Sequence, residues 1–250
     1  MKITIALSFL AALCTIEAVP TSTSLENLRI LVRNTKWNVQ TAIRDLELLR
    51  IHAEDDTLRQ VSEKWNEEQD SHRTYKTILI SGIRNEVNDA KAAGKSASSL
   101  DSCYEKAVDG IKKSEKVAYD DAIKCVDDAR DSIHKTLGFV DNLVSTGEAL
   151  LTDLDNVFLD CHNTDRYRME SCINGELATI KASLSSLEQD RTTAEITIAP
   201  VSKNFVTQTS NCIKQAYSVT YTTGSSIKMG LTLCIGTARA VATATEKPSP

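Results

Sequence analysis

The sequence predicts an all-α protein, an elongated bundle of long antiparallel helices that includes a disulfide-laddered helical hairpin. Three observations predict this class. No proline occurs between Thr21 and Ala199, apolar residues recur at helical spacing along most of the chain, and six cysteines lie where the two arms of a hairpin would face each other. Proline is the main helix breaker, so its absence over that span favours long helices.

The clearest helix is predicted over residues 25–49, after an N-cap candidate at Ser24. Its stripe alternates steps of three and four and comprises Leu25, Leu28, Val32, Thr35, Val39, Ala42, Leu46 and Leu49. A rhythm kept over this length is compatible with a coiled coil, and so with a homo-oligomer formed through this N-terminal helix. An internal seam of a bundle is the commoner use of such a stripe.

The acidic stretch at residues 54–56 predicts a turn or a helix start. A second helix is predicted from Thr57 to a break near Gly94, so residues 19–94 are expected to form an N-terminal helical hairpin. Residues 95–99 contain three serines and read as a linker.

Residues 100–243 are predicted to form the disulfide-stapled hairpin. Its first arm starts near Leu100 and extends towards Cys161, with Gly138 and Gly147 as candidate interruptions.

The second arm is predicted to run from Cys172 to about Glu195, break near Pro200 and resume at residue 203. The β-branched residues of this last stretch suit strands as well, but its apolar stripe favours a helix. Residues 244–250 are expected to be a disordered tail.

The first 18 residues have the layout of a secretory signal peptide. Lys2 precedes an apolar run from Ile3 to Cys14, and Ala18 offers a small residue for cleavage. Cleavage there removes Cys14 and leaves an even number of cysteines, which in an oxidising compartment predicts disulfides. The expected location is therefore secreted and extracellular.

The cysteine positions predict how the helices pair. Facing residues of an antiparallel hairpin have numbers that add to a nearly constant value, because both helices rise equally per residue. Cys161 with Cys172 gives 333, whereas Cys125 with Cys212 and Cys103 with Cys234 both give 337. We therefore expect a three-rung ladder closed by these bridges, and the remaining offset would be absorbed by a break around Pro200.

Other connectivities stay open, including a local bridge between Cys103 and Cys125. On a continuous helix these residues lie about 33 Å apart, so the bridge would need a bend between them. Charge favours the ladder, because residues 100–161 carry 14 acidic and seven basic residues whereas residues 203–245 carry four bases and no acid. The acidic residues also fit a solvated helix face, and both interpretations can hold together.

No catalytic, cofactor-binding or metal-binding residues are predicted. The four histidines share no ligand spacing typical of zinc. Asp160-Cys161-His162 places a thiol beside a base, but a cysteine in a secreted chain with an even cysteine count is expected to be oxidised. The net charge of -5 is mild and shows no footprint for nucleic acid, and no stretch of the mature chain is apolar enough to span a membrane.

A short pattern in the first stapled helix resembles the insect domain named after the tsetse midgut EP protein. The residues that carry the resemblance are Cys103, Tyr104, Tyr119, Ala122, Cys125 and Ala129, and it would extend over residues 100–234. It implies a secreted, cysteine-containing helical protein, with links to the gut and to immune challenge. The chain ends in Lys247-Pro248-Ser249-Pro250 rather than in a Glu-Pro repeat, so functions of that repeat are not implied.

Two functions from different classes follow from these features. The first is a non-enzymatic binding or structural protein of an extracellular fluid, gut lumen or glandular secretion, which acts on an extracellular protein or surface. The second is a carrier that holds lipid or another apolar ligand between amphipathic helices. A ladder of disulfides would oppose the opening that such a carrier needs.

Overall fold

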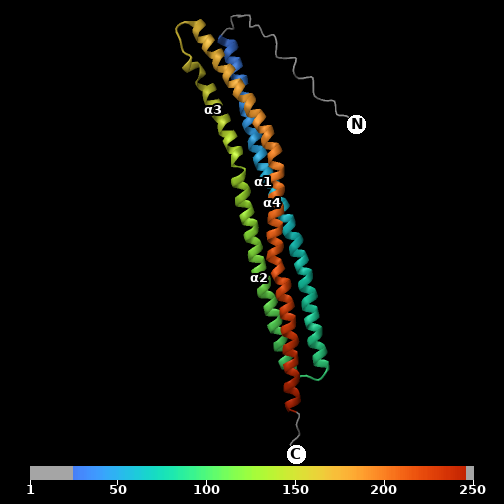
Figure 1. Ribbon diagram of the computed structural model, residues 1–250. Helices are drawn as coiled ribbons and strands as arrows, with labels where there is room; N and C mark the ends of the chain where they lie inside the picture. The colour runs from blue at the N-terminus through green and yellow to red at the C-terminus, as the bar shows by residue number, and fades with distance from the viewer. Residues whose placement is uncertain (1–24, 246–250) are drawn as a thin grey trace, which may run out of the picture. The chain divides into compact units, whose positions relative to one another are not determined.

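The computed structural model describes the backbone of residues 25–245 and the side chains of residues 25–238. This part of the chain is all helical, as predicted. It consists of α1 (Leu25–Ala92), α2 (Ala97–Thr136), α3 (Gly138–Asp160) and α4 (Arg166–Thr245) (Figure 1). The predicted signal peptide lies outside the described residues, and so does the predicted tail from residue 246 onward, whereas residues 244 and 245 belong to α4.

Helix α1 is continuous from Leu25 to Ala92, where a turn was expected, so the described part of the predicted hairpin at residues 19–94 is one helix. The acidic residues at 54–56 are accommodated on the helix surface by pairs with their own neighbours. Glu54 lies 3.7 Å from Arg50 and Asp56 lies 3.2 Å from Arg59, while the Thr57 hydroxyl donates to the Ala53 carbonyl at 2.6 Å. These i,i+3 and i,i+4 pairs support a helix, and the segment contains no glycine or proline to stop it.

The turn between α1 and α2 is formed where glycine permits a left-handed backbone. Gly94 has a φ of 81°, and its N–H donates to the Lys91 carbonyl at 3.0 Å. This is the usual way to end a helix, because a residue with a Cβ is strained at positive φ. Helix α2 begins at Ala97, three residues before the predicted start and inside the predicted linker at 95–99.

The first arm of the stapled hairpin is interrupted once, at Leu137 between α2 and α3. Gly138 follows directly, in agreement with its prediction as a candidate interruption. Gly147 does not interrupt α3. It lies where a Cβ would come within 2.6 Å of Ile43 Cγ1, so its role is to let α3 approach α1 closely.

The predicted break near Pro200 is absent, because α4 passes through the proline without ending. Pro200 is on the exposed side of the helix, whereas Ala194 and Ile198 on its buried side continue the core stripe. Packing of that stripe therefore outweighs the loss of one backbone hydrogen bond at the proline. The ambiguous stretch from residue 203 is helical, as predicted.

The chain divides into two compact units that share the long helices. The described residues of unit 1 are 25–43 and 146–187, and those of unit 2 are 44–145 and 188–245. This division crosses the predicted boundary between residues 19–94 and 100–243, because a helix too long for one unit continues into the next.

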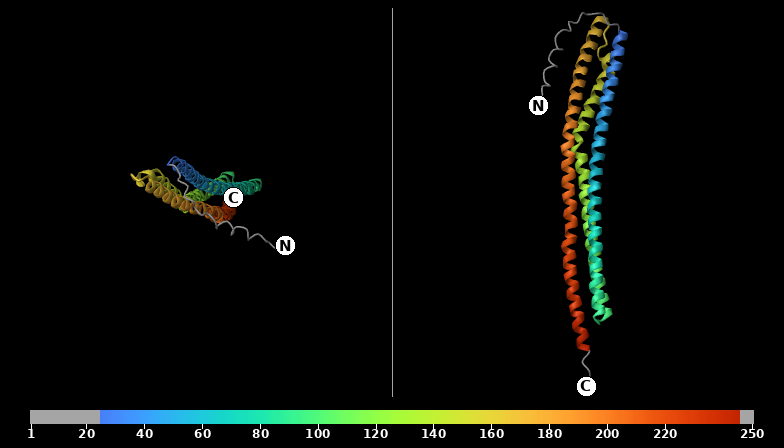
Figure 2. Two further views of the ribbon diagram at one scale, coloured as in Figure 1. Left: turned by 90° about the horizontal axis from the view of Figure 1, so that it is seen from above. Right: turned by 90° about the vertical axis from the view of Figure 1, so that its right-hand side faces the viewer.

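In unit 2, α1 and α2 are antiparallel, as the tight turn between them requires (Figures 1 and 2). Helix α4 is antiparallel to α2 and parallel to α1. Ion pairs show these directions: Lys76–Glu115 and Lys91–Asp101 join α1 to α2, and Glu68–Lys214 and Glu86–Lys228 join α1 to α4. The core between the three helices includes Ile83, Leu100, Ile111 and Leu231.

In unit 1, α1, α3 and α4 pack in the same mutual directions. Lys36 of α1 pairs with Asp155 of α3, and Cys161 is joined to Cys172 where α3 turns into α4. Aliphatic side chains fill the interior, among them Leu28, Leu154 and Ile173.

The regular N-terminal stripe is used inside the chain. Leu28, Val39 and Leu46 have no exposed surface, and Val32, Thr35 and Ala42 are also buried. A homo-oligomer through this stripe would have to expose these residues first, so the stripe serves as a bundle seam and not as an outer surface.

Candidate functional site

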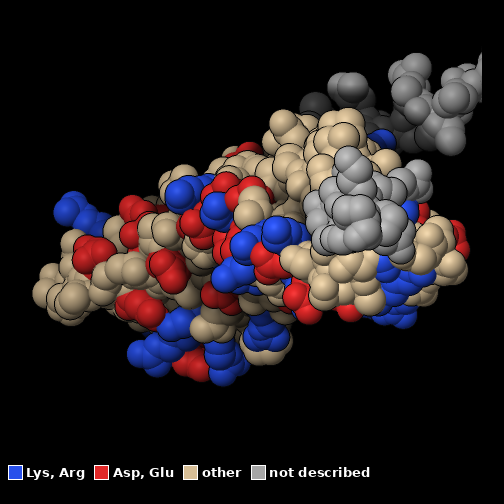
Figure 3. All heavy atoms as spheres, turned by 90° about the horizontal axis from the view of Figure 1, so that it is seen from below, with Lys and Arg blue, Asp and Glu red and all other residues tan. Residues whose placement is uncertain are grey.

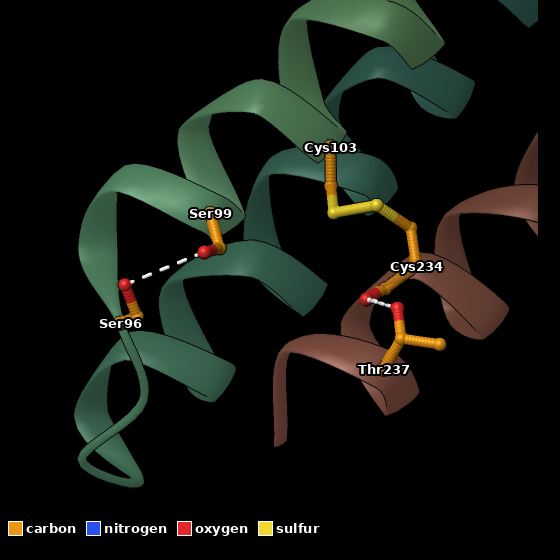
Figure 4. Close-up of a disulfide and its surroundings, with 5 residues drawn as sticks. All are labelled: Ser96, Ser99, Cys103, Cys234 and Thr237. Carbon is orange, nitrogen blue, oxygen red and sulfur yellow. Dashed lines mark hydrogen bonds between the residues drawn. A yellow bond between two sulfur atoms is a disulfide. The ribbon is translucent and has the colours of Figure 1, made fainter. Parts of the chain in front are cut away.

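The six cysteines form the three predicted bridges. Their Cα–Cα distances are 5.9 Å for Cys103–Cys234, 5.9 Å for Cys125–Cys212 and 5.6 Å for Cys161–Cys172, all within the range that a disulfide allows. Figure 4 shows Cys103 and Cys234 reaching towards each other from α2 and α4, with the Thr237 hydroxyl donating to the Cys234 carbonyl at 2.8 Å. The ladder is therefore confirmed.

Aromatic side chains of α1, α2 and α4 contact one another in unit 2. The members of this aromatic cluster are Trp65, His72 and Tyr75 of α1, Tyr119 of α2, and Tyr217 and Tyr221 of α4. The rings of Tyr75 and Tyr221 meet edge to face at 4.5 Å, and those of His72 and Tyr217 lie 5.2 Å apart. Such pairs hold three helices in a fixed register.

Two tyrosines of this cluster tie α1 and α4 by hydrogen bonds. The Trp65 indole N–H donates to the Tyr217 hydroxyl at 3.4 Å, and the Tyr75 hydroxyl donates to the Tyr221 carbonyl at 3.3 Å. Gly224 makes room for Tyr75, because a Cβ at position 224 would overlap the Tyr75 hydroxyl.

A groove of about 360 Å³ opens to solvent beside the aromatic cluster. Its lining consists of Gln69, His72 and Arg73 of α1, Glu115 and Tyr119 of α2, and Tyr217 of α4. His72 and Tyr217 are buried and lie at its base, whereas Tyr119 is 42% exposed. The volume falls within the range of ligand sites, and the lining offers amide, guanidinium, carboxylate, hydroxyl and imidazole groups.

The charges around this groove are balanced. Lys76 donates to both carboxylate oxygens of Glu115, at 2.7 and 2.9 Å, so that the acid is already engaged. Arg73 pairs with Asp70 at 3.3 Å and remains largely exposed. The groove is therefore suited to a ligand recognised by hydrogen bonds and ring contacts more than by net charge.

His72 is a buried titratable group of this site. Burial lowers the pKa of its imidazole below the ordinary value of 6.5; Glu115 opposes this effect and Lys76 reinforces it. The neutral imidazole therefore predominates at neutral pH. It presents one donor and one acceptor nitrogen at the base of the groove.

A much smaller cavity of about 10 Å³ is bordered by His72, Tyr75, Ser114 and Thr220. The Ser114 hydroxyl oxygen is buried and has no hydrogen-bond partner among the described residues. A cavity of this size with several polar neighbours accommodates one water molecule and nothing larger.

Sequence reasoning placed the cysteines but missed this aromatic cluster. One signal was present: the sum of 337 given by two cysteine pairs puts Tyr119 opposite residue 218, beside Tyr217. Nothing comparable placed His72 and Tyr75, because α1 carries no cysteine to fix its register against the other helices.

No family model, no curated protein and no solved structure matches this chain. The resemblance to the tsetse EP domain stays a prediction. Among residues 25–245, no helix is both long and apolar enough to cross a membrane. No group of three or more His, Cys, Asp or Glu side chains suitable for a metal ion occurs in the same part of the chain.

Proposed function

We propose that this chain is a secreted, non-enzymatic binding protein of an extracellular fluid, gut lumen or glandular secretion, as the insect EP domain that it resembles would imply. The observation that carries the proposal is the groove of about 360 Å³ with buried His72 and Tyr217 at its base. The predicted signal peptide and the three disulfides support an oxidising extracellular setting.

The chemistry of the groove favours binding over turnover. Both oxygens of Glu115 accept hydrogen bonds from Lys76, so this carboxylate is engaged within the protein and is not directed at a ligand. The hydrogen-bonding groups that remain, on Gln69, His72 and Tyr119, can orient a ligand against the tyrosine rings.

No observation favours the alternative of a lipid carrier. The cavity bordered by His72 and Tyr75 holds only about 10 Å³, and the larger groove beside it is mostly polar. In unit 2 two disulfides join α2 to α4, so these helices cannot part to admit an apolar ligand.

Trp65 provides a reporter for ligand binding. Its ring lies 5.7 Å from that of Tyr119, which lines the groove, whereas Trp37, the second of the two tryptophans, is 64% exposed. A Trp37→Phe protein therefore reports from Trp65 alone. We expect a member of a panel of neutral sugars, short peptides and amines to change its emission in a saturable way.

Two further variants separate the groove from the rest of the surface. Tyr119→Ala, made in the Trp37→Phe protein, is expected to abolish the saturable change, whereas Tyr167→Ala at a remote, 76% exposed tyrosine leaves it intact. Saturable binding that survives Tyr119→Ala would exclude this groove. If one protein molecule converts several molecules of any bound compound into product, the proposal of a non-enzymatic protein is contradicted.

A further inference from the structure

The face of unit 2 on which α2 and α4 lie side by side carries two open hollows, one over each disulfide of the unit. The hollow over Cys103–Cys234 has a volume of about 220 Å³ and that over Cys125–Cys212 about 360 Å³. The lining includes the small residues Ala107, Ala216 and Gly230, whose short side chains leave the hollows unfilled. A shallow groove of this kind between two helices leaves room for side chains of a further helix.

The α2 side of this face carries charges in a symmetric order. Spaced by three or four, its residues share one side of the helix; they are Lys106, Gly110, Lys113, Val117, Asp121, Lys124 and Asp128. Val117 is the midpoint and is 55% exposed. Lys106 and Asp128 lie 11 residues from it on either side, and Lys113 and Asp121 lie four residues from it.

The charges along this stripe of α2 are complementary to those of a second α2 that runs in the opposite direction. If a second copy of α2 is laid antiparallel across the first with Val117 on the two-fold axis, Lys106 meets Asp128 of the second copy and Lys113 meets its Asp121. Gly110 then meets Lys124 of the second copy, so no like charges face each other along the stripe. Isologous interfaces have this property, since each contact occurs twice.

The charges at the two ends of the stripe are available for such contacts. Among the described residues, neither Lys106 nor Asp128 has an ion-pair partner in its own chain. Lys113 and Asp121 do have partners, but these lie on the same exposed helix, at Asp109 and Lys124. An exposed ion pair contributes little free energy. The protein therefore loses little when Lys113 and Asp121 leave these partners and pair with a second chain.

The α4 side of the face adds apolar surface without charge. Val219, Met229 and Leu233 are 52%, 66% and 67% exposed. The lysines of this stretch, Lys214 and Lys228, pair with glutamates of α1 instead. We propose that the protein forms a two-fold symmetric dimer in which the α2–α4 faces of unit 2 pack together with Val117 at the axis.

The size of this face fits a dimer of modest affinity. From residue 106 to residue 128 a helix extends roughly 33 Å, and two adjacent helices are roughly 20 Å wide. Each copy thus contributes about 660 Å², and the total of about 1,300 Å² lies at the lower end of stable interfaces. The dimer is therefore expected to dissociate on dilution.

Charge exchange in the purified full-length mature protein tests the proposal. Lys106→Asp sets carboxylates against each other at two symmetric contacts and should raise the dimer dissociation constant about tenfold, measured by sedimentation velocity over a wide concentration range. Asp128→Lys should act equally. Because the exchanged charges again face opposite signs, Lys106→Asp with Asp128→Lys in one chain should restore dimerisation.

Lys112→Asp provides the matched control, since Lys112 is exposed on α2 but faces away from the stripe. It should leave the dissociation constant unchanged. A protein that stays monomeric at every concentration overturns the proposal. So does a double exchange that fails to restore the dimer, or a Lys112→Asp variant as weak as Lys106→Asp.

A cysteine on the axis tests the register independently. Val117→Cys would meet its own copy and should form a disulfide-linked dimer readily under mild oxidation. Ile78→Cys, at a 67% exposed position of α1 in the same unit, should not. Equal cross-linking of the two variants would place the contact elsewhere.

Discussion

At the scale of single residues, Gly224 marks the closest approach of α4 to Tyr75. A glycine in a helix interior is normally less stable than alanine by about 1 kcal/mol, yet here an added Cβ would overlap the Tyr75 hydroxyl and come within 2.9 Å of Leu79. The cost of overpacking exceeds the helix-propensity gain. Tyr75 must move, and its hydrogen bond to the Tyr221 carbonyl is lost with it.

Gly224→Ala is therefore expected to lower the free energy of unfolding by about 1–3 kcal/mol in urea titrations. Gly175 is the matched control, because a Cβ there meets no atom within 4 Å. Gly175→Ala should raise the stability by up to about 1 kcal/mol. Equal effects of the two substitutions would show that Tyr75 does not pack against Gly224.

His72 makes the stability of the protein depend on pH. Because burial holds the pKa of His72 below its ordinary value of 6.5, the unfolded chain takes up a proton at a higher pH than the folded chain does. The contribution of the neutral imidazole to the free energy of unfolding is complete above about pH 6.5. It is lost as the pH falls below that value. The facing groups are Glu115, which opposes the lowering of the His72 pKa, and Lys76, which reinforces it.

Unfolding free energies measured between pH 7 and pH 5 should fall for the wild type and fall less for His72→Gln. His52→Gln removes an exposed histidine of the same helix and should follow the wild-type curve. Parallel curves for His72→Gln and the wild type would indicate that His72 is solvated in the folded protein.

At the scale of elements, periodic stripes predicted helices better than breaker residues predicted their ends. The stripe of residues 25–49 and the helical assignment of the stretch from 203 are both confirmed, whereas the breaks at 54–56 and Pro200 are wrong. An acidic cluster or one exposed proline acts locally. The buried stripe of a long helix gains from every turn it continues, and only packing in the folded chain shows which effect is larger.

Pro200 is thus expected to be accommodated within α4 but to lower the free energy of unfolding. Pro200→Ala restores one backbone hydrogen bond and should raise the unfolding free energy by about 1–3 kcal/mol without changing the helix content seen by circular dichroism. Thr197→Ala, one turn earlier and also exposed, should change stability by less than about 0.5 kcal/mol. If Pro200→Ala increases helix content instead, α4 is broken at that position in solution.

At the scale of the whole molecule, the cysteines fixed the register of α2 and α3 against α4 but left α1 free. The cysteine pattern therefore predicted the ladder with Cys161–Cys172 at its closed end, and its sum of 337 also contained the unused signal that sets Tyr119 near Tyr217. The pattern could not place His72 in the groove, because the position of α1 follows from dispersed contacts such as Lys76–Glu115. A site formed by three helices needs the register of all three.

The bridges are also divided between the units, so each unit should depend on its own bridges for stability. Cys161–Cys172 closes unit 1, whereas the other two bridges lie in unit 2. Loss of the first bridge, by Cys161→Ser with Cys172→Ser, should therefore destabilise unit 1 by about 3 kcal/mol while unit 2 retains both of its own.

Amide hydrogen exchange resolves this difference along the chain. In the Cys161→Ser, Cys172→Ser protein, exchange should accelerate over residues 146–187 and stay slow over residues 97–136. Cys125→Ser with Cys212→Ser should reverse the pattern. The loss of a bridge should ease local opening only in the unit that contains it. If either double variant accelerates exchange equally in both units, the two units unfold as one cooperative body.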